Sequence, residues 1–181
     1  MPPLADEDLS AEQRAAQAAL VSGPRGALAG PFVPMLRSPG LMDHAQKLGA
    51  YLRFESALPD RIKELAILAV ACHWGQGYEW AFHLPLALKA GVRRETAEAM
   101  AYGRALEGLT PEESAALELI HQIQTDRAVD DATFARAVEQ FGEAGVVDLL
   151  GFAGYYGLLA MVMNAARTPS EPAEIALPVR G

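Results

Sequence analysis

The chain has 181 residues, 51% of them apolar, enough for one domain that buries a core and also packs against copies of itself. Its formal net charge is −8 and it has no run of lysine and arginine, which excludes nucleic acid and anionic membranes as expected partners. The one cysteine, Cys72, excludes an intrachain disulfide and suits a reducing compartment. Because Met1–Ser22 is charged and lacks a continuous apolar run, we expect no signal peptide and a cytoplasmic protein.

Residues 1–33 are expected to form an N-terminal extension with one helix and a glycine- and proline-rich loop. Ser10 and Gln13 have the spacing of a capping box, which predicts a helix that ends near Val21. The glycines and prolines of Ser22–Pro34 then predict an irregular connector. Two interpretations stay open for this connector: it lies over a pocket, or it is a plain surface loop.

A helical domain is expected over residues 34–167, and its first helix is predicted over Pro39–Glu55. A central helix is predicted over Arg61–Trp74, with Asp60 as its N-cap. The periodicity of this central helix predicts a single apolar face, made by Ile62, Leu65, Leu68 and Ala69.

Gly75 and Gly77 predict a turn after the central helix, because glycine costs about 1 kcal/mol relative to alanine inside a helix. A second helix is predicted to begin near Tyr78 and to end at Gly91, which suits the position after a helix. Pro85 lies within this stretch, so we expect either a kink there or a helix start close to it.

The remaining helices are predicted over Val92–Arg104, Thr110–Thr125, Asp130–Phe141 and Glu143–Arg167. The last of these is nearly free of charge, which raises the possibility of a membrane span. Its uncharged run of about 15 residues is shorter than the ~20 that a bilayer needs, so a buried core helix is the better interpretation. Residues 168–181 predict an extended C-terminal tail, and no strand pattern competes, so the fold class is all-α with a single domain.

The candidate chemistry lies around the glycine turn. Glu79 and His83 are four residues apart, so both project from one face of the second helix. A carboxylate beside an imidazole orients the ring and suits a general acid or base near neutral pH. Glu64, on the central helix, adds a second carboxylate. The alternative is an exposed Glu–His pair with no function, although the aromatic neighbours argue against a solvated pair.

These residues resemble the carboxymuconolactone decarboxylase family, which shares the alkylhydroperoxidase D-like helical bundle. The decarboxylase branch carries Glu-x3-His, which Glu79 and His83 match. The peroxidase branch carries the motif Glu-x11-Cys-x2-Cys-x3-His. In this chain Glu64 and His83 match its glutamate and histidine, while Gln76 and Glu79 stand at the two cysteine positions. The resemblance extends over roughly Pro34 to Asn164, through the lead-in Leu36–Leu68, an HWGxxYEWxxH signature at His73–His83, and Gly154-Tyr155-Tyr156.

The resemblance implies a cofactor-free lyase or related acid/base enzyme that acts on a small organic acid or lactone. His83 would donate or accept the proton, Glu79 would orient it, and Glu64 would be a second catalytic carboxylate. The expected substrate-binding residues are Tyr78, His73, Trp74 and Arg61, with Arg53 a further candidate for a substrate carboxylate. The family also implies a homo-oligomer: a dimer, trimer or hexamer.

Three other hypotheses stay open. A peroxidase or peroxiredoxin-like antioxidant would need a reactive thiolate, and Cys72, alone on an apolar helix, more often packs in a core. A metal site from His73, Glu79 and His83 lacks a dedicated zinc spacing, so we expect no metal. A non-catalytic oligomeric binding protein is the last possibility, and retention of the three acid/base residues argues against it.

Overall fold

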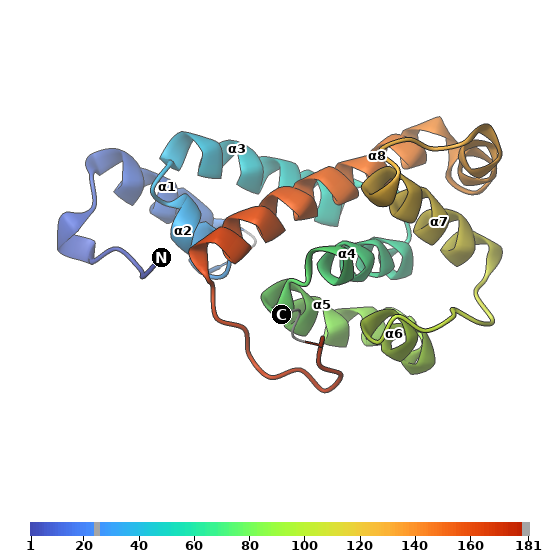
Figure 1. Cartoon of the computed structure of the whole chain (residues 1–181). Coiled ribbons are helices and arrows are strands. Elements are labelled where there is room, and N and C mark those ends of the chain that lie inside the picture. The colour runs from blue at the N-terminus through green and yellow to red at the C-terminus, as the bar shows by residue number, and fades with distance from the viewer. Residues whose placement is uncertain (24–25, 179–181) are drawn as a thin grey trace.

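A computed structural model describes residues 1–23 and 26–178, and every regular element in these ranges is helical (Figure 1). The all-α prediction is therefore confirmed. The elements are η1 (Asp6–Asp8), α1 (Ala11–Ser22), α2 (Phe32–Met35), α3 (Pro39–Ala50), the π-helical turn η2 (Tyr51–Glu55), α4 (Asp60–Trp74), α5 (Gly77–Lys89), α6 (Arg94–Ala101), α7 (Pro111–Thr125) and α8 (Asp131–Ala166).

Helix α4 is the centre of the bundle and packs against α5, α7 and α8 (Figure 1). The expected single apolar face is wrong, because α4 separates two hydrophobic clusters and is buried on both sides. Ile62, Ala66, Ile67 and Val70 face the larger cluster, and Leu65, Leu68 and Ala71 face the smaller one. A helix enclosed on two sides has no polar stripe of ordinary width, so periodicity alone cannot define its orientation.

The turn between α4 and α5 forms at the predicted glycines. Gly75 ends α4 in the left-handed region, with φ 59°, where glycine has no steric penalty. Helix α5 then begins at Gly77 and continues through Pro85, so the alternative start near that proline does not occur. At the other end of α4, Pro59 is the N-cap and Asp60 is already helical, one residue from the prediction.

The two last predicted helices join into α8, which crosses the whole molecule (Figure 1). Gly142, with φ 67° and ψ 169°, interrupts it at the predicted boundary. In the described part of the chain, α8 alone is long and apolar enough to cross a membrane by length and composition, yet 50% of its most apolar window is buried inside the fold. Leu149, Phe152 and Met163 are fully buried, so α8 serves as a core helix, as predicted.

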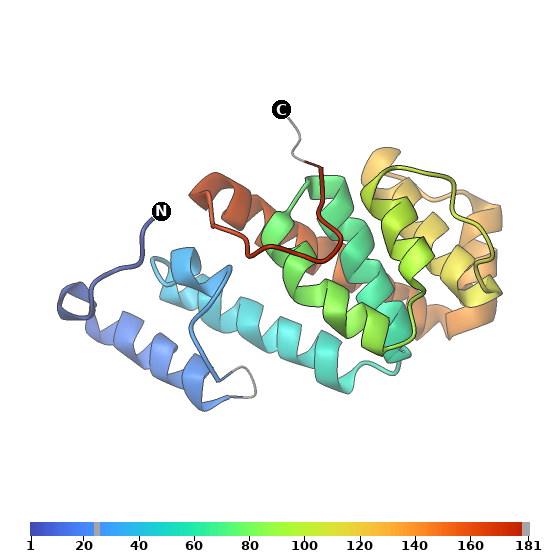
Figure 2. The ribbon, with the colours of Figure 1, turned by 90° about the horizontal axis from the view of Figure 1, so that it is seen from below.

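The two ends of the chain cover different sides of the bundle. Helix α1 packs on α3, and the connector behind it ends in the short helix α2, which the sequence did not predict. Residues 168–178 have no helix and run across α5 (Figure 2). There the Trp80 Nε1 donates a hydrogen bond to the Ile175 carbonyl at 2.5 Å, and Arg94 pairs with Glu174. The tail thus closes the smaller hydrophobic cluster, of which Ile175 is a member.

Candidate functional site

His83 lies on the inner face of α5, 3% exposed, with a carboxylate at each ring nitrogen. Its Nδ1 is 2.7 Å from the Glu64 Oε2 on α4, and its Nε2 is 3.5 Å from the Glu79 Oε2 one turn earlier on α5. The structure therefore brings the three predicted catalytic residues together. The closer partner is Glu64 rather than Glu79, so Glu64 is the residue placed to orient the ring.

Gln76 fixes the start of α5 and so positions Glu79. Its side-chain oxygen accepts hydrogen bonds from the backbone N–H groups of Tyr78 at 2.6 Å and Glu79 at 3.3 Å. Its amide nitrogen donates to the Asn164 side chain on α8 at 2.9 Å. Asn164 in turn donates to the Trp74 carbonyl at 3.0 Å. The helix start is thus capped and joined to α8 in one network, at a position where the peroxidase branch carries a cysteine.

A cavity of about 400 Å³ opens in front of His83. It is lined by Ala27, Ala29, Pro31, Phe32, Arg53, Phe54, Tyr78, Glu79, Phe82, His83, Tyr156 and Leu159. Four of these residues belong to the connector and to α2, so the connector lies over the pocket, which was one of its two open interpretations. The size suits a small organic molecule, with mostly apolar walls and a few polar groups.

Gly30 lets the connector close on Tyr78. Its φ is +56°, and a Cβ built there would lie 2.4 Å from the Tyr78 Cε1, inside contact distance. Only a residue without a side chain fits this conformation and this approach. Tyr78, a predicted substrate-binding residue, is thereby held on the cavity wall.

We expect Gly30→Ala to weaken ligand binding in the cavity several-fold and to lower stability by about 1–3 kcal/mol, because the new methyl group displaces the Tyr78 ring. Gly26→Ala is the matched control, since Gly26 also has positive φ, +71°, but has open space where its Cβ would be. Denaturant unfolding and ligand affinity of the two variants separate backbone strain from displacement of Tyr78. Equal losses of stability and of ligand affinity in both variants would show that the close approach of Gly30 to Tyr78 has no effect of its own.

Arg53 is the cation of this cavity. It comes from η2, and its guanidinium lies 5.3 Å from the centre of the Phe54 ring and 5.9 Å from that of Phe82. None of the ion pairs among the described residues includes Arg53. Arg53 is therefore placed to bind a carboxylate of a ligand.

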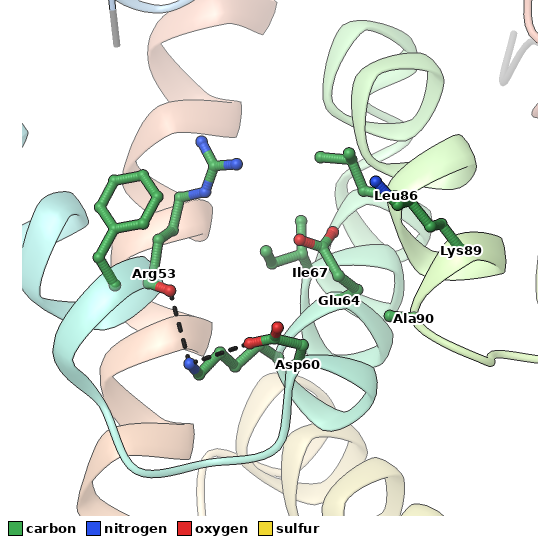
Figure 3. A pocket seen from close by; sticks show the side chains of 9 residues that line it. Arg53, Asp60, Glu64, Ile67, Leu86, Lys89 and Ala90 are labelled. Carbon is green, nitrogen blue, oxygen red and sulfur yellow. Dashed lines mark hydrogen bonds and ion pairs between the residues drawn. The ribbon is translucent and has the colours of Figure 1, made fainter. Parts of the chain in front are cut away.

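A second cavity, of about 340 Å³, has Glu64 in its lining, and Figure 3 shows the side chains around it. It shares Arg53 and Phe54 with the first cavity. Glu64 lines the second cavity while its carboxylate contacts His83, which lines the first. Glu64 thus joins the second cavity to the His83 ring.

Tyr156 brings a phenol to the first cavity from α8. It is 3% exposed, and its ring meets the His83 ring edge-on at 5.3 Å. Burial, and next the charge of Glu79, raise the pKa of Tyr156 well above its usual value, so the hydroxyl keeps its proton at physiological pH. Of the predicted tyrosine pair, Tyr156 lines the cavity and Tyr155 does not.

The structure does not bring His73, Trp74 and Arg61 to this cavity, and their predicted role in substrate binding beside His83 is corrected here. His73 lies nine residues after Glu64, half a turn out of phase on α4, and with Trp74 it lines another cavity against α7 and α8. Arg61 instead pairs with α7, at 2.9 Å from Glu112 and 3.4 Å from Glu113.

Cys72 also lies outside the site. It is partly buried against the smaller hydrophobic cluster and lines a separate cavity with tail residues. Over residues 1–23 and 26–178, no group of three or more His, Cys, Asp or Glu side chains is arranged to hold a metal ion. His73, which the metal hypothesis requires, lines a different cavity from Glu79 and His83.

The sequence pattern of the carboxymuconolactone decarboxylase family matches residues 39–122, from the start of α3 into α7. This segment supplies Glu64, Glu79 and His83. Residues 39–122 therefore carry the pattern of this family. The chain holds a single cysteine, so it lacks the pair of redox cysteines. No curated protein sequence matches the chain.

Solved structures share the fold of this chain. One is the alkylhydroperoxidase AhpD core, an uncharacterised peroxidase-related protein from Ralstonia eutropha JMP134. It aligns with a TM-score of 0.73 and 16% sequence identity, and the alignment covers 94% of this chain and 91% of that chain. Another is a protein of unknown function from Agrobacterium tumefaciens, suggested to be the antioxidant defence protein AhpD. It aligns with a TM-score of 0.68 and 17% sequence identity, and the alignment covers 76% of this chain and 95% of that chain. At these identities the likeness establishes the AhpD-like fold.

Proposed function

We propose that this protein is a cofactor-free acid/base enzyme that decarboxylates a small organic acid or lactone. The observation that carries the proposal is His83, buried between two carboxylates and facing a cavity whose one unpaired cation, among the described residues, is Arg53. A poised proton donor and a carboxylate-binding group then face the same small space.

The proposed reaction follows from these positions. Arg53 binds a substrate carboxylate and the apolar walls exclude water. The bond from the reacting carbon to the departing carboxylate breaks, CO₂ leaves, and the electron pair stays on the substrate as a carbanion or enolate. His83, protonated, delivers a proton to that carbon and becomes neutral. Glu64, which is exposed to the second cavity, returns the proton to the ring and regains its own from water.

The peroxidase alternative finds less support in the same geometry. Peroxide reduction by this fold's redox branch needs thiols at the positions of Gln76 and Glu79, and here these are a helix cap and a carboxylate. Cys72 does not line the cavity of His83. A one-cysteine peroxidase would therefore have to work without the acid/base residues.

The test measures two activities of the purified protein: CO₂ release from a panel of carboxylated lactones and oxo acids, and hydroperoxide turnover with a dithiol donor. Wild type and Cys72→Ser are compared in both assays. We expect CO₂ release that Cys72→Ser leaves unchanged. Hydroperoxide turnover that disappears in Cys72→Ser would replace the proposal with a one-cysteine peroxidase. The absence of both activities would favour a non-catalytic binding protein.

Arg53→Gln is expected to raise KM about tenfold or more with a smaller change in kcat, because hydrogen bonds to a charged group are worth roughly 1.5–3 kcal/mol. Arg61→Gln is the control, since Arg61 is engaged by Glu112 and Glu113 outside the cavity. Steady-state kinetics on the best substrate provide the comparison. A larger KM effect for Arg61→Gln would place the carboxylate-binding group outside this cavity.

A further inference from the structure

The Tyr156 hydroxyl is a buried polar group that has no part in the proposed proton transfer. The residue is 3% exposed, and within residues 1–23 and 26–178 no group accepts a hydrogen bond from its hydroxyl. A buried donor without an acceptor costs about 1–3 kcal/mol, so native proteins rarely leave one unless water or a ligand completes it. The hydroxyl is therefore a donor that water or a ligand oxygen has to complete.

The ring of Tyr156 is held firmly. It stacks on Phe152 with ring centres 6.1 Å apart and an angle of 2°, and it meets Tyr155 edge-on at 5.2 Å. The His83 ring contacts it from a third side at 88°. Three aromatic contacts fix the direction of the phenol, so its donor is preorganised.

Tyr156 also shares its surroundings with the reacting groups. It lines the same cavity as His83 and Arg53. The charges of Glu79 and Arg53, both on the cavity wall, act on the Tyr156 phenol and shift its pKa in opposite directions, while burial keeps it protonated. The hydroxyl is thus a donor close to the cavity.

We propose that Tyr156 donates a hydrogen bond to the substrate's carbonyl oxygen and stabilises the enolate oxygen that forms there as CO₂ leaves. This inference rests on the proposed decarboxylation and adds the substrate class: an acid whose departing carboxylate lies on the carbon next to a carbonyl, as in a β-oxo acid or an equivalent lactone. The electron pair of the broken carbon–carbon bond moves to that oxygen. Tyr156 keeps its proton throughout, and His83 supplies the proton that carbon receives.

Equilibrium binding of two probes tests the donor without requiring turnover. The first is 4-nitrophenolate, an oxyanion whose absorbance reports hydrogen bonding, and the second is nitrobenzene, which has the same ring without the oxyanion. Wild type, Tyr156→Phe and Tyr155→Phe are compared, because Tyr155 is equally buried but lies outside the cavity lining.

We expect Tyr156→Phe to weaken 4-nitrophenolate binding about tenfold or more and to abolish its spectral shift, with nitrobenzene binding unchanged. Tyr155→Phe is expected to bind both probes like wild type. No binding of 4-nitrophenolate by wild type, equal binding by Tyr156→Phe, or parallel loss of both probes would overturn the proposal. The last result would mean that the ring acts by packing alone.

Kinetics separate this inference from the proposed function. With a substrate that releases CO₂, Tyr156→Phe is expected to lower kcat roughly 100- to 1,000-fold while KM changes little, as for loss of one oxyanion donor. An unchanged kcat would overturn the role of Tyr156 and leave the decarboxylation intact. Absence of CO₂ release from every substrate, together with Tyr156-dependent phenolate binding, would instead refute the decarboxylation and retain the oxyanion site.

Discussion

His83→Asn is expected to lower kcat by about 100- to 10,000-fold, the range that a positioned general acid or base contributes. The asparagine amide can take the place of Nδ1 and keep a hydrogen bond to Glu64, which lies 2.7 Å from that nitrogen. It has no ionisable nitrogen to give a proton to the substrate. Steady-state kinetics on a decarboxylated substrate measure the loss.

His121→Asn is the matched control, because His121 is exposed on α7 and distant from the cavity lining. Circular dichroism of both variants establishes that they fold, since His83→Asn also leaves Glu64 and Glu79 without an imidazole between them. If His83→Asn is folded and retains more than about a tenth of the wild-type kcat, His83 is not the proton donor.

Trp80→Ala is expected to cost about 3–5 kcal/mol of unfolding free energy, the usual cost of removing a fully buried aromatic side chain. Trp80 is 1% exposed on α5, in the smaller hydrophobic cluster. Its loss leaves a cavity there and also leaves the Ile175 carbonyl without its 2.5 Å donor, so the C-terminal tail should detach. Urea unfolding followed by far-UV circular dichroism measures the cost.

Trp74→Ala provides the comparison within the same molecule, because Trp74 is 37% exposed and its substitution should cost much less. Limited proteolysis adds a local measurement: residues 168–178 should be cleaved faster in Trp80→Ala than in wild type or Trp74→Ala. Similar unfolding costs for the two tryptophans would show that the tail contact contributes little to the fold.

Local signals in the sequence predicted much of the fold. Ser10 and Gln13 form the predicted capping box that opens α1, and Thr110 is the N-cap of α7, where Glu113 completes a second box. Each box needs only residues three apart, so its effect does not depend on the rest of the chain. The break at Gly142 is equally local. The short helix α2 and the two-sided burial of α4 depend on packing between distant segments, which periodicity does not reveal.

The candidate site divides in the same way. Glu79 and His83 share one helix face, and the family pattern adds Glu64, so the proximity of these three side chains could be predicted, while their catalytic role remains a proposal. Arg53 and Tyr156 come from η2 and α8, and only the folded chain brings them to α5. The cytoplasmic location and the homo-oligomer remain predictions from sequence.

His73, Trp74 and Arg61 were expected in the site because they are close to it in sequence. Helical geometry turns them elsewhere: the first two face α7 and α8, and Arg61 extends to the acidic start of α7. Adjacency along a helix is therefore a poor guide to a shared pocket unless the residues also share a face.

The cap formed by Gln76 limits how this protein could evolve. Two substitutions, Gln76→Cys and Glu79→Cys, would give this chain the thiol pattern of the redox branch. The first of them removes both hydrogen bonds to the start of α5 and the link to Asn164, a loss of about 1–2 kcal/mol for the cap alone. The second removes the carboxylate beside His83. Each single substitution therefore loses one structural feature: the first loses the cap of α5, and the second loses the carboxylate at the His83 Nε2.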